Sequence, residues 1–100
     1  MTESQDRTYT LVDPRAYYHA KCHESNVPPQ HRPELVEYIV AHKPTGKFLA
    51  AVLRNDLLES VLLAEDEDTQ QHLIDIVFFL YNYAPIKCWK SVELHNAWVK

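Results

Sequence analysis

The chain has 100 residues, of which 46% are hydrophobic, and its 14 acidic and 10 basic side chains give a net charge of −4. A chain of this length forms one domain, and basic residues that occur singly argue against nucleic-acid binding, which depends on clustered cations. The single glycine, Gly46, excludes the glycine-rich phosphate loop and the nucleophile elbow, because each needs several glycines.

The first 30 residues are predicted to form an N-terminal arm with one short helix. Residues 1–8 are polar without a periodic pattern, and residues 9–12 allow a short extended segment. The pair Asp13-Pro14 is typical of a helix start, because Asp caps free backbone N–H groups and Pro is tolerated at the first helical position. Pro28 and Pro29 end any helix, so a Pro-rich linker is expected before a helical domain at residues 31–100.

Residues 31–64 predict helices separated by turn signals. Pro33 is expected at the start of the first, where apolar residues recur at helical spacing. After a Pro-Thr-Gly turn, the apolar spacing at residues 48–62 fits one long helix or two helices that meet at Asn55-Asp56. Two helices are favoured, because the Asp56 side chain can cap the turn that follows it.

A helix over residues 69–83 is the best-supported element. It follows four consecutive carboxylates, which stabilise a helix N-terminus, and it is apolar on nearly every side, which is typical of a helix surrounded by protein. Pro85 ends it, and Ser91 is expected to cap a last short helix. The prediction is an all-α fold: a compact bundle of four to five short helices around a central apolar helix, with a partly irregular N-terminal arm.

The predicted compartment is the cytoplasm of the cell that makes the protein. The N-terminal residues lack the apolar core of a signal peptide, and no apolar run approaches the roughly 20 residues that span a membrane. Cys22 and Cys88 are therefore expected to be reduced thiols. Cys88 lies in a hydrophobic connector, where a buried, inert thiol is the expected outcome, so no residue is assigned to catalysis.

One combination of residues suggests a metal site. At helical spacing His19, Cys22 and His23 share a face and offer ligands that zinc accepts. A closed site needs a fourth ligand, and no second pair at short spacing supplies it. No metal or other cofactor is predicted, and a small zinc- or thiol-dependent protein stays an alternative.

The aromatic residues are more numerous than a small core needs. Tyr and Trp are enriched at binding hot spots. If the rest of the chain is too short to cover the helix at residues 69–83, its cover is a second copy or a different protein. The candidate partner-binding residues are Phe78, Tyr81, Tyr83, Trp89, Trp98, Asn55, Asp56 and Asn82. For the last three, capping and helix–helix hydrogen bonds are the competing structural roles.

The second half of the chain also resembles known proteins. Residues 48–57 are followed by the acidic turn, then by Leu80-Tyr81-Asn82, Ala84-Pro85 and Cys88-Trp89. As a set these residues resemble a group of small uncharacterised proteins of bacteriophage and prophage genomes, over about residues 44–98. In many of those proteins a glycine follows the Cys-Trp pair, where this chain has Lys90. The resemblance implies a phage-related source in a bacterial host cell and carries no activity.

Together these observations predict a non-enzymatic helical protein–protein interaction module. It is expected to associate with itself and to bind a host or viral protein. The excess of apolar helix surface and the lack of a catalytic signature favour this prediction. The alternatives are the zinc- or thiol-dependent protein described above and a helical protein that binds nucleic acid.

Overall fold

The computed structural model describes residues 13–64 and 66–99, and the regular structure within these ranges is entirely helical. The all-α fold class is therefore confirmed, although the chain forms more and shorter helices than the four to five predicted. The elements in chain order are α2 (Pro14–Glu24), η1 (Pro29–His31), α3 (Arg32–Ala41), α4 (Lys47–Leu53), α5 (Leu57–Leu63), α6 (Glu67–Gln71), α7 (Leu73–Tyr83), η2 (Ile86–Cys88) and α8 (Val92–Trp98).

Local capping chemistry determines where three of these helices begin. The side-chain oxygens of Asp13, Asp56 and Ser91 each accept a backbone N–H from the helix that follows, at 3.1 Å. Such a bond satisfies one of the N–H groups that have no partner within the helix. Asn55, with a left-handed φ of 63°, separates α4 from α5. The break predicted at Asn55-Asp56 is therefore confirmed.

The helix predicted over residues 69–83 is two helices, α6 and α7. The first begins at Glu67, with the Thr69 N–H donating to the Asp66 carboxylate at 2.6 Å. The chain leaves helical geometry at His72 (φ −102°, ψ 13°), whose ring nitrogen Nδ1 lies 2.7 Å from the Asp75 carboxylate. The sequence pattern stays helical through this residue, so it gives no signal of the break.

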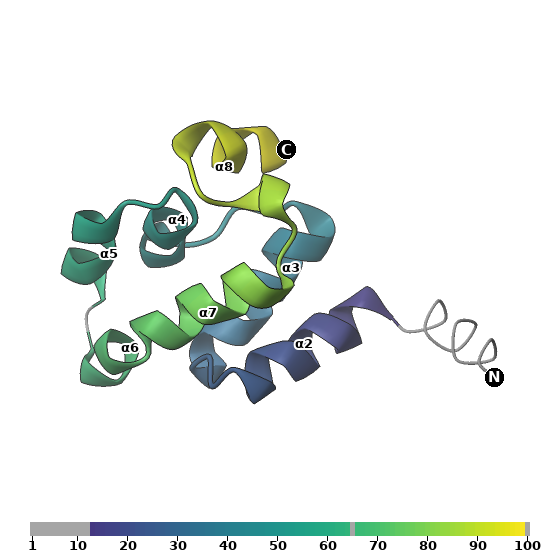
Figure 1. Ribbon diagram of the computed structural model, residues 1–100, viewed down its shortest axis with the longest axis horizontal. Coiled ribbons are helices and arrows are strands. Elements are labelled where there is room, and N and C mark those ends of the chain that lie inside the picture. Colours follow the sequence, from purple (N-terminus) through teal and green to yellow (C-terminus); the bar gives the residue numbers. More distant parts are fainter. Residues whose placement is uncertain (1–12, 65, 100) are drawn as a thin grey trace.

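The core lies between α2, α3, α4 and one side of α7. Figure 1 shows α7 crossing the middle of the molecule, with α8 at the top of the view and α5 and α6 at the left. Residues 13–30, assigned to the N-terminal arm in the sequence analysis, contribute Cys22 and Val27 to this same core. The other core residues are Leu35, Val36, Tyr38, Ile39, Leu49, Val52, Leu53, Ile76, Phe79, Leu80, Cys88 and Trp89.

The expectation that the central apolar helix is surrounded by protein is wrong for this chain by itself. Ile76 and Phe79 of α7 are fully buried, whereas Phe78 and Tyr81 of the same helix are 57% and 70% exposed. The other described helices cover only one side of α7. The other side of an almost entirely apolar helix therefore faces solvent.

Lys90, in the turn before α8, has an unusual backbone conformation. Its backbone φ is 98°, a region that glycine enters at no steric cost and other residues rarely adopt. Its N–H donates to the Leu53 carbonyl at 2.9 Å, which joins this turn to the end of α4.

Tyr38 connects three elements of the core. Its hydroxyl donates to the Cys88 carbonyl in η2, and its own carbonyl accepts the Trp98 indole N–H from α8 at 2.8 Å. Tyr38→Phe leaves a buried carbonyl without its donor, so we expect the free energy of unfolding to fall by about 1–3 kcal/mol in urea denaturation. Tyr81→Phe is the control, because that hydroxyl is on an exposed side chain; equal losses for the two variants would contradict this role of Tyr38.

Candidate functional site

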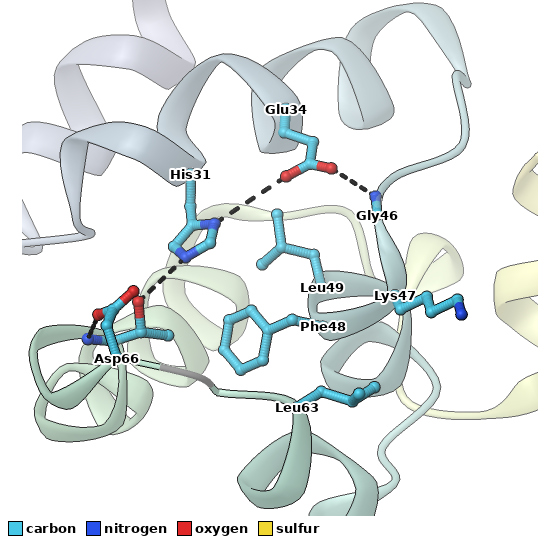
Figure 2. A pocket seen from close by; sticks show the side chains of 9 residues that line it. His31, Glu34, Gly46, Lys47, Phe48, Leu49, Leu63 and Asp66 are labelled. Atoms are coloured by element: carbon cyan, nitrogen blue, oxygen red, sulfur yellow. Dashed lines mark hydrogen bonds and ion pairs between the residues drawn. The ribbon is translucent and has the colours of Figure 1, made fainter.

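An open cavity of about 390 Å³ lies where the start of α3, the start of α4 and the α5–α6 connection meet. Its volume is in the range of small-molecule sites. Figure 2 shows the Phe48 ring within it, 5.2 Å from the His31 ring between centroids. The other lining residues are Glu34, Gly46, Lys47, Leu49, Leu63, Asp66 and Thr69.

Thr69, His31 and Glu34 in this cavity are arranged in the sequence hydroxyl, imidazole, carboxylate that is found in nucleophilic catalytic sites. The Thr69 hydroxyl lies 3.3 Å from Nε2 of His31, and Nδ1 of the same ring lies 3.9 Å from the Glu34 carboxylate. The longer distance exceeds a hydrogen bond. Thr69 is only 2% exposed, and its hydroxyl is also 3.4 Å from the Gln30 amide. A buried hydroxyl with these hydrogen-bond partners is not accessible to a substrate, so the arrangement supports a structural role.

The carboxylates of the cavity also hold helices in place. Glu34 accepts the Gly46 N–H and so joins α3 to the start of α4. A Cβ on Gly46 would lie 3.0 Å from that carboxylate, which makes glycine the residue that fits the contact best. Hydrogen bonds from the Thr69 backbone and hydroxyl lower the pKa of Asp66. The polar groups of this cavity are thus used to fasten α3, α4 and α6.

The residues of the zinc and thiol alternative do not come together. Cys22 is fully buried in the core, whereas His19 and His23 are exposed on the outside of α2. Burial raises the pKa of the Cys22 and Cys88 thiols to about 12, so both are protonated at neutral pH. Within residues 13–64 and 66–99, no group of three or more His, Cys, Asp or Glu side chains is placed to hold a metal ion.

A large apolar surface is the second candidate site. On α7, exposed apolar side chains recur at positions i, i+3, i+4 and i+7, the spacing of one helix face. On α5 they recur at i, i+1, i+4 and i+5, again along one face. We name this surface the α5–α7 face, and it consists of Leu57, Leu58, Val61, Leu62, Ile74, Val77, Phe78 and Tyr81.

A narrow groove lies between the two helices of this face. It has a volume of about 60 Å³, and its walls include Leu57 and Ser60 of α5 and Leu73 and Val77 of α7. Trp89, which is 7% exposed, also lines it. The two apolar stripes therefore border the same depression.

The structure brings six of the eight predicted partner-binding residues to this region. Phe78 and Tyr81 belong to the α5–α7 face, and Asn55, Asp56 and Trp89 line the groove. The sixth is the exposed Asn82 on α7, whose amide donates to the Phe78 carbonyl at 2.9 Å. Asn55, Asp56 and Asn82 thus have the local structural roles that were the alternative to partner binding. The clearest case is Asp56, which caps α5.

The other two predicted residues lie elsewhere. Tyr83 is beside α2, with Nζ of Lys21 5.1 Å from its ring centroid. Trp98 packs on α3, with its ring centroid 4.2 Å from that of His42. Neither residue shares a surface with the α5–α7 face, because α7 turns Tyr83 toward its core side and α8 lies against α3.

Sequence reasoning missed the α5 half of this face. Its leucines follow the spacing that normally marks a core helix, and none of them was among the predicted partner-binding residues. The sequence of α7 did indicate an exposed apolar surface, because this helix has two apolar stripes and only one of them can pack on the core. The second stripe, which runs from Ile74 to Tyr81, predicts an exposed surface in a chain with few other helices to cover it.

Comparisons of the chain with protein-family models, curated proteins and solved structures find no match. The resemblance to phage proteins stays a prediction. Among the described residues, no helix has both the length and the apolar character to cross a membrane.

Proposed function

We propose that this protein is a non-enzymatic protein–protein interaction module that binds its partner through the α5–α7 face. One observation carries the proposal: eight large apolar side chains are exposed on two helices that line one groove. At roughly 100 Å² each they present roughly 800 Å², which is the area that one partner contributes to a standard interface. The largest apolar patch of a typical monomer is about 300–600 Å².

Packing of the core does not account for the exposed apolar side chains of this surface. Ser60 is the one buried residue of α5, whereas Leu57, Leu58 and Leu62 are exposed. Exposed apolar side chains contribute little to the stability of the monomer and favour aggregation. A helix that needed only to cover the core would carry polar residues at these positions.

The proposed setting follows from the resemblance to phage proteins. It is the cytoplasm of a bacterial host cell, and the partner is a host or viral protein. A second copy of the chain is the alternative partner within this proposal, because it would cover the same apolar side chains. The geometry at Cys22 and at Thr69 favours neither a metal-dependent nor a nucleophilic activity.

Site-specific photo-crosslinking in the organism that encodes the protein tests this proposal. The photoreactive residue p-benzoylphenylalanine replaces Tyr81 or Leu58 on the proposed surface, and it replaces the exposed Ala97 on α8 as the control. We expect adducts of one common mass from positions 81 and 58 and none from position 97. We also expect Leu62→Asp to remove both adducts while leaving the unfolding free energy within about 0.5 kcal/mol.

Two results would contradict the proposal. One is the absence of any adduct at positions 81 and 58. The other is the same adduct from position 97, because contact would then not depend on the α5–α7 face. An adduct of twice the mass of the chain would identify a second copy as the partner.

A further inference from the structure

Acidic and basic residues are unevenly distributed along the sequence, although the net charge is small. Residues 55–84, which form the whole α5–α7 face, contain seven Asp and Glu residues and no Lys or Arg. Their formal charge is therefore −7. The rest of the chain has 10 basic and seven acidic residues, a formal charge of +3. The apolar surface thus lies within the most acidic part of the protein.

Three of the seven carboxylates border the apolar stripes. With 100° between successive helix residues, Glu59 falls beside the α5 stripe on the side away from the groove. Asp75 falls beside the α7 stripe, also on the side away from the groove. Asp56 lies at the groove itself, where it is one of the lining residues. A ligand in the groove would therefore meet carboxylates on both flanks.

Few of these carboxylates have a positively charged partner within the described part of the protein. In the described part of the segment, ion pairs join Asp68 and Asp75 to one side chain, His72, at 3.5 Å and 2.7 Å. Glu59 and Glu67 are exposed to solvent. Of the three carboxylates at the border, Asp75 is paired with His72. Asp56 accepts the Glu59 N–H, but Asp56 and Glu59 form no ion pair within the described residues and remain open to an external cation.

This distribution of charge selects among the possible occupants of the groove. A second copy docked face to face would place two sets of carboxylates opposite each other, and like charges across an interface are unfavourable. Nucleic acids and anionic lipid surfaces are repelled for the same reason. A partner that carries cations beside an apolar stripe matches both features of the surface, and a groove between two helices is a shape that commonly receives a third helix.

We propose that the α5–α7 face binds an amphipathic helix of another protein, whose apolar stripe is flanked by Lys and Arg. This inference rests on the proposed interaction function and adds the chemical class of the partner. The apolar stripe of that helix lies between Leu57 and Val77, and its cations approach Glu59 and Asp75.

Two synthetic peptides of about 18 residues, long enough to form a helix, provide the test. Both carry Leu and Phe at i, i+3, i+4 and i+7, and the flanking positions are Lys and Arg in one and Glu in the other. We expect fluorescence titration to find that the basic peptide binds at least about tenfold more tightly. Its affinity should fall as salt concentration rises, because exposed charge pairs are screened.

Two charge-reversal variants locate the effect. Glu59→Lys should weaken binding of the basic peptide by about threefold, the effect expected for one exposed charge pair. Glu93→Lys makes the same change in the first turn of α8, also at an exposed position, and should leave the affinity unchanged.

The outcomes separate this inference from the function on which it rests. Equal binding of the two peptides, abolished for both by Phe78→Asp, would overturn the inference and leave the interaction function standing. Failure of both peptides to bind would also overturn it, and if the crosslinks were missing as well, both proposals would fail. A dimer in light scattering that Phe78→Asp dissociates would identify a second copy as the occupant and overturn the inference.

Discussion

Phe79→Ala is expected to lower the free energy of unfolding by about 3–5 kcal/mol, the range for truncating a buried aromatic residue. Phe79 is fully buried on the core side of α7, with its ring centroid 6.1 Å from that of Tyr83. A domain of this size is stable by on the order of 5–10 kcal/mol, so this single change removes about half of its stability. Urea denaturation followed by circular dichroism measures the loss.

The preceding residue provides the matched control. Phe78 is 57% exposed on the opposite side of the same helix, so Phe78→Ala should change the free energy of unfolding by no more than about 1 kcal/mol. The same variant should weaken photo-crosslinking from position 81, because it removes part of the α5–α7 face. Similar losses of stability for the two alanine variants would mean that α7 does not present these two sides as described.

Raising the pH from 7 to about 10.5 is expected to lower the free energy of unfolding by about 4 kcal/mol through the two cysteines alone. Burial raises the pKa of both thiols to about 12 from an ordinary value of 9.0. Above pH 9 the unfolded chain releases these protons while the folded chain keeps them, so stability falls as pH rises toward 12. Each thiol contributes about 2 kcal/mol of this loss at pH 10.5.

Urea denaturation at a series of pH values measures this dependence. Below about pH 8 the thiols should contribute almost no slope, because they are then protonated in both states. Replacing both Cys22 and Cys88 by Ala should flatten the alkaline slope whatever its effect on stability at pH 7. Burial also raises the pKa of Tyr38, so a smaller loss in the same direction should remain. An unchanged slope in the double variant would contradict the burial of the thiols.

Much of the secondary structure was predictable because its causes are local. The Asp13-Pro14 start, the cap at Asp56 and the cap at Ser91 each depend on a side chain and a backbone N–H two or three residues away. The break at His72 was not predictable, because its ring bonds to Asp75 without interrupting the apolar pattern. The candidate surface was predicted in part: Phe78 and Tyr81 stood out as aromatic residues, whereas the α5 leucines resembled core residues.

By itself, the sequence determined that the chain is helical, that α2, α5 and α8 begin at capping residues and that residues 55–84 carry all their formal charge as carboxylates. These properties depend on neighbouring residues or on composition. Which side of each helix faces the core was decided only by the tertiary structure. Phe78 and Phe79 are chemically identical neighbours, and Cys22 lies one residue from His23, yet one of each pair is buried. The reason is that an apolar helix can bury either stripe equally well, and the choice depends on which neighbouring helices are present to cover it.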